Sequence, residues 1–384
     1  MSPYLNEESF EEGLTAANRS IELDPNLAEG HAILGLIKIN EAPDSFDEGI
    51  THLRRALELD ASLGDAYNWL SMALNYAGQY DEADLVAAQG HAVDPLLPSI
   101  THTHAMKLSD AGEFNRALRI LERHTRLPAM TNPIIDGLSE VNFQWGRYAD
   151  SLSWWPDSPA ALEALGLYAE ADKRLTQMGP GDLRTLFAHV LPSLHSRGGH
   201  GQAWAALSET LLDLELGPAD LGPAARNSLL ITQVKAGLYD EAIDIFETVL
   251  DADPTRVMES SWVIRDQDAL NALAFAYLKT GDAARAAPLL DYRDEPITRL
   301  EPLASPHFLE PMALNAALRG DIEEAYVLLS RAVDLGWANY YTTINDPRWG
   351  DTLEQPRFVA LLERVQENLA EQRAEVEAML ADAK

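Results

Sequence analysis

Several features that support common kinds of protein chemistry are missing from this chain of 384 residues. There is no cysteine, which excludes disulfides, thiolate catalysis and cysteine metal sites. No apolar run approaches the roughly 20 residues that a membrane-spanning helix needs. The first residues, Met-Ser-Pro-Tyr-Leu-Asn-Glu-Glu, lack the basic stretch and apolar core of a signal peptide. A cytoplasmic location is therefore expected by default.

Positive charge is also scarce. The chain has 29 lysines and arginines against 61 aspartates and glutamates, which gives a net charge of −32 and a pI near 4.5. Such a surface repels phosphate groups, so we expect this segment to bind neither nucleic acid nor anionic membranes. We interpret the acidity as a source of solubility, because like charge keeps copies of an extended surface apart. A specific basic partner is the alternative.

No catalytic or metal-binding constellation is evident. His102 and His104 are two residues apart and so point to nearly opposite sides of a helix. His195 and His200 flank a Gly-Gly turn, and no further ligands lie nearby in the sequence to complete a metal site. A phosphate-binding loop followed by lysine and a Gly-x-Ser-x-Gly elbow are both missing. The sequence thus predicts no enzyme, no cofactor and no metal.

A repeated pattern organises the first part of the chain. Gly78, Gly112 and Gly146 are each 34 residues apart. An aromatic residue follows each glycine by two positions, and an alanine or serine follows it by five. Glycine ends a helix readily because it adopts a left-handed cap, and Asp94-Pro95 stops the helix that follows Gly78. Each repeat is therefore expected to be a pair of helices.

The period and the residue order resemble those of the tetratricopeptide repeat (TPR). The resemblance implies an all-α fold, a right-handed α-solenoid of about nine helical hairpins with a long C-terminal capping helix. Four parts are expected: an N-terminal array (1–155), degenerate hairpins (156–218), a C-terminal array (219–336), and an irregular segment with the capping helix (337–384). The first helix, about Glu7 to Leu23, resembles the second half of a repeat, so we expect the chain to derive from a longer parent. The alternative is that this helix is an unusual cap.

The predicted C-terminal helix begins at Pro356 and carries a short heptad seam. The seam residues considered for self-association are Leu362, Val365, Leu369, Val376 and Met379. The favoured interpretation is a cap whose first half covers the last repeat. A homodimer formed through the second half is an additional hypothesis.

A second resemblance covers about the last fifty residues. It rests on Ala332 to Trp337, Asp346-Pro347, and Pro356 and Phe358 before a charged helix. This part resembles the end of a bacterial group in which TPRs follow a winged-helix or nucleotide-cyclase domain. The resemblance implies a regulatory parent, but the chain offers no DNA-binding or cyclase residues to which a role can be transferred.

In the TPR family the first helix of each hairpin lines a concave groove that receives a peptide. The positions that the resemblance assigns to the groove are Asn68, Met72, Asn75 and Tyr76 in the N-terminal half, and Asn227, Lys235, Asn271, Phe275 and Lys279 in the C-terminal half. An asparagine amide can donate and accept hydrogen bonds, so it can hold a peptide backbone. The lysines could attract a carboxylate. Alternatively, these residues only solvate or pack the groove.

The fifth position of each repeat has no lysine or arginine, so the clamp that chaperone-binding family members use for a C-terminal carboxylate is not implied. The first functional hypothesis is a non-catalytic protein-protein interaction scaffold that binds a peptide or partner domain in the groove. The alternative is the sensory segment of a bacterial transcriptional regulator or nucleotide cyclase.

Overall fold

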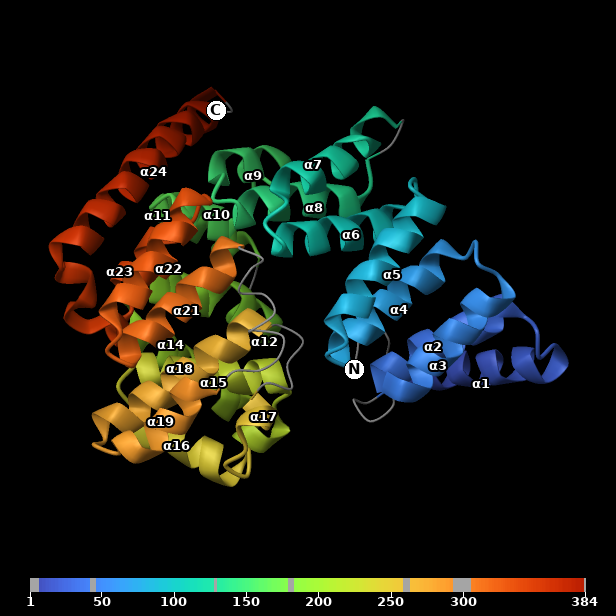
Figure 1. The fold of residues 1–384 in the computed structure, drawn as a ribbon, viewed down its shortest axis with the longest axis horizontal. Helices are drawn as coiled ribbons and strands as arrows, with labels where there is room; N and C mark the ends of the chain where they lie inside the picture. The colour runs from blue at the N-terminus through green and yellow to red at the C-terminus, as the bar shows by residue number, and fades with distance from the viewer. Residues whose placement is uncertain are drawn as a thin grey trace. The chain divides into compact units, whose positions relative to one another are not determined.

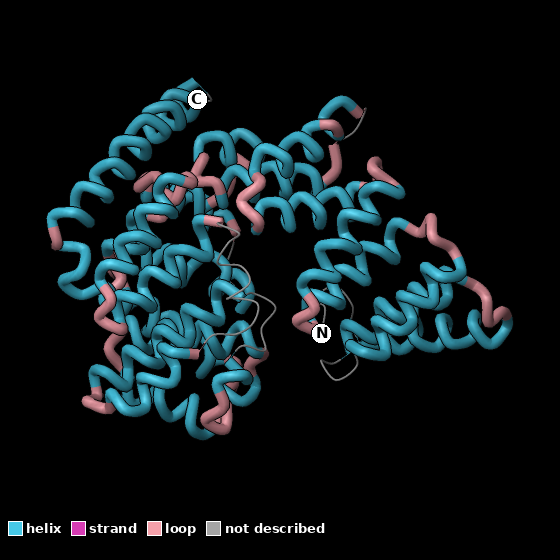
Figure 2. The backbone as a smooth tube through the Cα atoms, viewed as in Figure 1, coloured by secondary structure: helices cyan, strands magenta, loops and turns pink. Residues whose placement is uncertain are grey.

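The computed structural model describes residues 7–41, 46–127, 130–178, 183–257, 263–292 and 305–382. Helices and turns account for all of the regular structure in these ranges, and none of the described residues is in a strand (Figures 1 and 2). The chain divides into two compact units, Met1–Leu138 and Ser139–Lys384. We call them the N-terminal and C-terminal units.

The N-terminal unit consists of consecutive antiparallel helices. Its elements are α1 (Glu7–Leu23), α2 (Ala28–Glu41), α3 (Phe46–Leu59), α4 (Gly64–Tyr76), α5 (Tyr80–Val93), α6 (Pro98–Asp110), α7 (Phe114–Glu122), η2 (His124–Arg126) and the first part of α8 (Asn132–Gln144). The pairs α2–α3, α4–α5 and α6–α7 form hairpins, and α1 packs against α2. We call the first helix of each hairpin an A helix and the second a B helix.

Glycine ends the A helices α4 and α6 as the sequence predicts. Gly78 has a φ of 73°, its N–H donates to the Asn75 carbonyl (3.2 Å), and the Gln79 N–H donates to the Leu74 carbonyl (2.8 Å). This is a Schellman cap, which needs a left-handed residue at the position that Gly78 takes. The glycines with positive φ between paired helices are Gly78, Gly112, Gly146, Gly166, Gly198, Gly237, Gly281 and Gly320. The predicted all-α helical-repeat fold is confirmed.

The C-terminal unit contains both regular and degenerate hairpins. Its elements are the rest of α8, α9 (Tyr148–Trp154), α10 (Pro159–Ala164), α11 (Tyr168–Gln177), α12 (Leu183–Thr185), η3 (Leu186–Val190), α13 (Leu191–Ser196), α14 (His200–Asp213), η4 (Pro218–Asp220), α15 (Pro223–Lys235), α16 (Tyr239–Thr248), α17 (Pro254–Val257), α18 (Val263–Lys279), α19 (Ala283–Asp291), α21 (Pro306–Leu318), α22 (Ile322–Asp334), α23 (Tyr340–Ile344), η5 (Pro347–Glu354) and α24 (Pro356–Asp382).

Irregularity between 156 and 218 has a visible cause in the described part of that stretch. The helices α10, α12 and α13 are short, and the π-helical turn η3 precedes Pro192, which has no N–H to continue an α-helix. The predicted break at Gly179-Pro180-Gly181 lies outside the described residues. The four-part division of the chain stays a prediction.

The capping helix α24 joins the two ends of the C-terminal unit. One apolar core holds Leu162 of α10, Leu314 of α21, Leu329 of α22 and Phe358 of α24. Near the far end of α24, the Gln372 side-chain amide donates to the Gly146 carbonyl (2.8 Å) and accepts from the Ala149 N–H (3.2 Å). The helix can be followed in Figure 1, past α22 and α23. The first and last hairpins of this unit therefore share a core.

The heptad seam of α24 faces this shared core. Leu362, Val365, Leu369 and Val376 are all buried there, whereas Met379 is 42% exposed. The seam thus serves as the predicted cap. Pairing of two copies through it stays a prediction.

Candidate functional site

The A helices of the N-terminal unit share a stripe of accessible side chains. The accessible positions recur every three or four residues along each helix, which places them on one side. They are Glu29, Ile33, Leu36 and Asn40 on α2; Asp65, Trp69, Met72 and Tyr76 on α4; and Ser99, Thr103, Met106 and Asp110 on α6. We call this set the N-terminal A-face. Its centre is apolar, and Ile33 and Tyr76 are 41% and 39% exposed.

Contacts between neighbouring helices make this face continuous. Helix α2 packs on α4, and α4 packs on α6. The Thr103 hydroxyl donates to the Asn68 side-chain oxygen (2.6 Å), and the Lys107 ammonium donates to the Asn75 side-chain oxygen. The predicted groove residues of this unit differ in exposure: Asn68 is buried, Met72 and Asn75 are half-buried, and Tyr76 is exposed.

The fixed charge along the stripe is acidic. Glu29 and Asp65 are exposed at the N-terminal ends of α2 and α4, and no lysine or arginine occupies a stripe position. The two lysines of α2 and α6 form ion pairs with B-helix carboxylates. Lys38 lies 3.3 Å from Glu48, and Lys107 lies 3.5 Å from Asp84. An apolar centre with an acidic edge can accept an apolar chain that carries positive charge.

The A helices of the C-terminal unit use their asparagines differently. Asn227 and Asn271 are buried. The Asn227 amide donates to the Val257 carbonyl (2.9 Å), and the Asn271 amide donates to the Pro311 carbonyl (2.9 Å). The Asn315 amide in turn donates to the Asn271 side-chain oxygen (3.0 Å). These amides do hold backbone carbonyls, but the carbonyls belong to this chain.

The stretch 337–355, which we call the C-terminal segment, lies across α15, α18 and α21. The Lys235 ammonium, at the end of α15, is 3.0 Å from the Asp346 carboxylate. Arg348 binds the same carboxylate through two nitrogens (2.6 and 2.9 Å) and reaches Asp268 of α18 (2.6 Å). Lys235, Asp346 and Arg348 are all buried. Lys235 thus already binds a carboxylate of its own chain.

Burial and neighbouring charges shift the pKa values of two carboxyl groups in this cluster in opposite directions. Although burial opposes its ionisation, Arg348 and Lys235 hold the pKa of the Asp346 carboxyl well below its usual range. Glu310 of α21 accepts a hydrogen bond from the Thr343 hydroxyl (3.2 Å). Burial, together with Asp268 and Asp346, raises the pKa of Glu310 to about 7. A protonated Glu310 leaves two cations facing two carboxylates.

The C-terminal segment also runs along the hairpin turns at the start of its unit. A Cβ built on Gly146 would collide with the Gly336 carbonyl oxygen, immediately before the segment. A Cβ on Gly166 would lie 2.7 Å from the Tyr341 hydroxyl. Near the third turn, the Asn345 amide donates to the Ser196 carbonyl (2.7 Å). The C-terminal segment can pack tightly against the Gly146 and Gly166 turns because glycine has no Cβ that would clash with it.

The remaining predicted groove residues of this unit have different exposures. Phe275 is buried and packs edge-to-face on Tyr239, with 6.0 Å between the ring centres. Lys279 is exposed, and its ammonium lies 4.9 Å from the centre of the Phe275 ring. Asp346 and Arg348 were not predicted as functional residues. The sequence signals at this place are that Asn345-Asp346-Pro347 interrupts a helical pattern and that Asp346-Pro347 belongs to the second resemblance.

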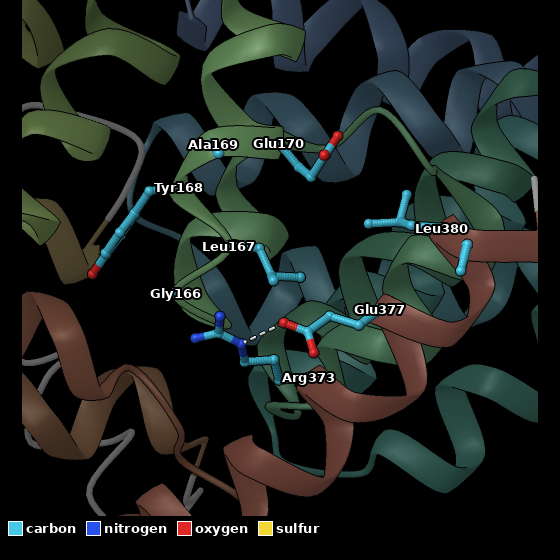
Figure 3. Close-up of a pocket in the computed structure, with 9 residues that line it drawn as sticks. Gly166, Leu167, Tyr168, Ala169, Glu170, Arg373, Glu377 and Leu380 are labelled. Atoms are coloured by element: carbon cyan, nitrogen blue, oxygen red, sulfur yellow. Dashed lines mark hydrogen bonds and ion pairs between the residues drawn. The ribbon is translucent and has the colours of Figure 1, made fainter. Parts of the chain in front are cut away.

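A cleft lies between the Gly166 turn and the end of α24 (Figure 3). Leu167 and Leu380 line it with apolar surface. Arg373 and Glu377, also in its lining, pair with each other at 2.9 Å. Its volume is about 480 Å³. The cleft could receive an apolar side chain, and its charged groups are arranged as an ion pair of α24.

Several histidines lie in pairs. His91 stacks on His104 with ring centres 5.4 Å apart, and the tilted pair His195 and His200 has its Nδ1 atoms 2.9 Å apart. Burial, with help from His91, lowers the pKa of His104 to about 4. Within the described ranges, no three histidine or acidic side chains are grouped so that they could hold a metal ion. Nor is any helix in those ranges long and apolar enough to cross a bilayer.

The chain is similar to several solved structures, at low identity and low TM-score. No family model and no curated protein match the sequence. The chain is similar to a solved human IFIT1 dimer with PPP-AAAA, at 14% identity over 99% of this chain and 96% of that chain, with a TM-score of 0.39. It is similar to the APC/C hetero-tetramer Cut9–Hcn1 (11% identity, 95% and 84% coverage, TM-score 0.35) and to the TPR domain of P58(IPK) (13% identity, 94% coverage of each, TM-score 0.22). Similarity at this level identifies neither a functional site nor a partner.

Proposed function

We propose that the chain is a non-catalytic protein-interaction scaffold that binds a peptide or partner domain on its N-terminal A-face. One observation carries the proposal: apolar side chains are exposed on adjacent A helices, with Ile33 41% and Tyr76 39% exposed. Water-exposed apolar patches of this kind are typical of interaction surfaces. Met72 and Met106 add side chains that adapt to different partners.

The C-terminal unit supports the proposal by analogy within one chain. Side chains connect its A helices to the C-terminal segment: the Asn345 amide donates to the Ser196 carbonyl at the end of α13, and Asp346 pairs with Lys235 of α15. A helices of this chain can therefore bind a further stretch of polypeptide that packs across them. The N-terminal unit presents the same helix type with exposed apolar residues, and Met72, Asn75 and Tyr76 are the predicted groove residues available there. Asn227, Lys235 and Asn271 are already bonded within the C-terminal unit.

Affinity capture from the native cell extract tests this proposal. We compare the full chain with the double variant Ile33→Glu/Met72→Glu. The matched control is Leu85→Glu, because Leu85 is 57% exposed on the B helix α5. We expect partners that the wild type and the control capture and the double variant loses. Partners retained by the double variant would contradict binding on the N-terminal A-face. Circular dichroism confirms that each variant is folded.

A further inference from the structure

We propose that the partner of the N-terminal A-face is a basic amphipathic polypeptide segment, with apolar side chains on one side and lysine or arginine beside them. This inference rests on the proposed function and specifies its partner. Solubility is a sufficient reason for the net charge of −32 over the chain as a whole. The distribution of charge and apolar surface in the N-terminal unit favours the alternative, a basic partner, at this one place.

The apolar part of the surface fits one face of an amphipathic segment. Leu36, Met72 and Met106 take equivalent positions on three adjacent A helices, and all three are half-buried, so part of each remains accessible. Ile33 and Tyr76 extend this row and are more exposed. A helix that presents apolar residues every three or four positions buries them in such a row. Methionine adds a flexible, polarizable side chain that adapts to the ligand.

Charge determines which amphipathic segment fits best. Glu29 and Asp65 are exposed at the edge of the row, and Asp136 is exposed on the next A helix, α8. The lysines closest to the row, Lys38 and Lys107, are held by Glu48 and Asp84. The field at the row is therefore negative, and it attracts lysine and arginine over a distance of about 8 Å at physiological salt.

The same charges disfavour other ligands. An acidic segment would place carboxylates beside Glu29 and Asp65, which are exposed and unsuited to bind them. Phosphates of a nucleic acid or of an anionic lipid surface meet the same repulsion. His102 does not reverse this field, since burial lowers its pKa and favours the neutral ring, while Asp136 acts in the opposite direction. Among these ligand classes, a basic polypeptide is the one whose charge complements the N-terminal A-face.

Two designed peptides test the inference on the full chain. The first is a helical peptide of leucine and lysine with leucines every three or four positions, and the second replaces each lysine with glutamate. Fluorescence anisotropy measures binding at low and at high salt. We expect the lysine peptide alone to bind, and its affinity to fall as salt increases. Equal binding of the glutamate peptide would overturn the inference while leaving the proposed scaffold intact.

Charge-reversal variants separate local recognition from general attraction to an acidic protein. Glu29→Lys/Asp65→Lys should weaken the lysine peptide by about tenfold, because two favourable charge contacts become repulsive. The matched control, Glu58→Lys/Glu122→Lys, makes the same charge change on exposed positions of the B helices α3 and α7. An equal loss in the control would overturn the inference.

Two further results also count against it. Binding of the full chain to phosphatidylserine vesicles that depends on the same residues would replace the polypeptide with a membrane. If neither peptide binds, the basic-segment inference fails, and the capture experiment with Ile33→Glu/Met72→Glu decides separately whether the scaffold proposal stands.

Discussion

The two units use the same hairpins and place different demands on equivalent residues. Tyr76 and Lys235 both take the thirteenth position of an A helix. Tyr76 is 39% exposed beside Phe46, whereas Lys235 is buried and binds Asp346. The difference lies in the C-terminal segment, because only the C-terminal unit has this segment across its A helices. A residue's place in the repeat thus determines its direction, and the surrounding chain determines its availability.

The largest predicted effect breaks the buried cluster of the C-terminal unit. Asp346→Ala leaves the Lys235 and Arg348 charges buried without their shared carboxylate, which should cost about 3–5 kcal/mol of unfolding free energy. Chemical denaturation measures it. The matched control is Arg54→Ala, which breaks the exposed pair with Glu82 in the N-terminal unit and should cost less than about 1 kcal/mol. Similar values for the two variants would contradict a structural difference between the units.

A pair of glycine substitutions tests whether the C-terminal segment rests on the hairpin turns. Gly146 and Gly237 both have positive φ, so alanine costs about 1–2 kcal/mol at either position. A Cβ at Gly146 would also collide with the Gly336 carbonyl, whereas nothing lies within 4 Å of one at Gly237. We expect Gly146→Ala to be the more destabilising by about 1–3 kcal/mol. Equal thermal denaturation midpoints for Gly146→Ala and Gly237→Ala would contradict packing of the C-terminal segment against the Gly146 turn.

The pH dependence of the C-terminal unit should reflect Glu310. Its pKa is raised from 4.5 to about 7, so the folded state binds a proton more tightly than the unfolded chain does. The stability that this proton contributes is fully present below 4.5 and is lost as the pH rises through about 7. Hydrogen exchange of the C-terminal segment, corrected for the intrinsic rate, should therefore increase across this range. Glu310→Gln should remove that dependence, whereas the exposed control Glu323→Gln should retain it.

The N-terminal unit should show the opposite trend. The pKa of His104 is lowered from 6.5 to about 4, so the folded state favours the neutral ring. The stability it contributes is present above 6.5 and is lost as the pH falls toward about 4. His104→Phe should flatten this part of the curve in urea denaturation followed at several pH values. An unchanged curve would show that other groups govern the acid response.

The sequence predicts the hairpins well because their determinants are local. Gly78 and Gly112 cap their helices through hydrogen bonds to residues at most five positions away. The capping role of α24 was also predictable, since its apolar seam is a single helix pattern. The pairing of Lys235 with Asp346 was not predictable, because those residues are far apart in sequence and meet only when the C-terminal segment crosses three A helices.

Asn227 and Asn271 illustrate the limit of transferring a groove from a repeat pattern. The pattern predicts an inward amide, and the structure does place each amide against backbone carbonyls. Asn227 binds Val257 of the short helix α17, whereas Asn271 binds Pro311 inside the A helix α21. For Asn68, the Thr103 hydroxyl of the next A helix takes the amide oxygen instead. Local sequence therefore gives the amide's direction but not its partner.

Site-specific photo-crosslinking tests the central contrast between the two units most directly. A photoreactive phenylalanine analogue replaces Tyr76 in one full-length variant and Lys279 in another, because both are exposed and both are the last residue of an A helix. The variants are irradiated in the native cell extract, and crosslinked partners are identified by mass spectrometry. We predict a crosslinked polypeptide partner, rich in lysine or arginine beside apolar residues, at position 76 and none at position 279. A partner crosslinked at position 279 and absent at position 76 would contradict the account.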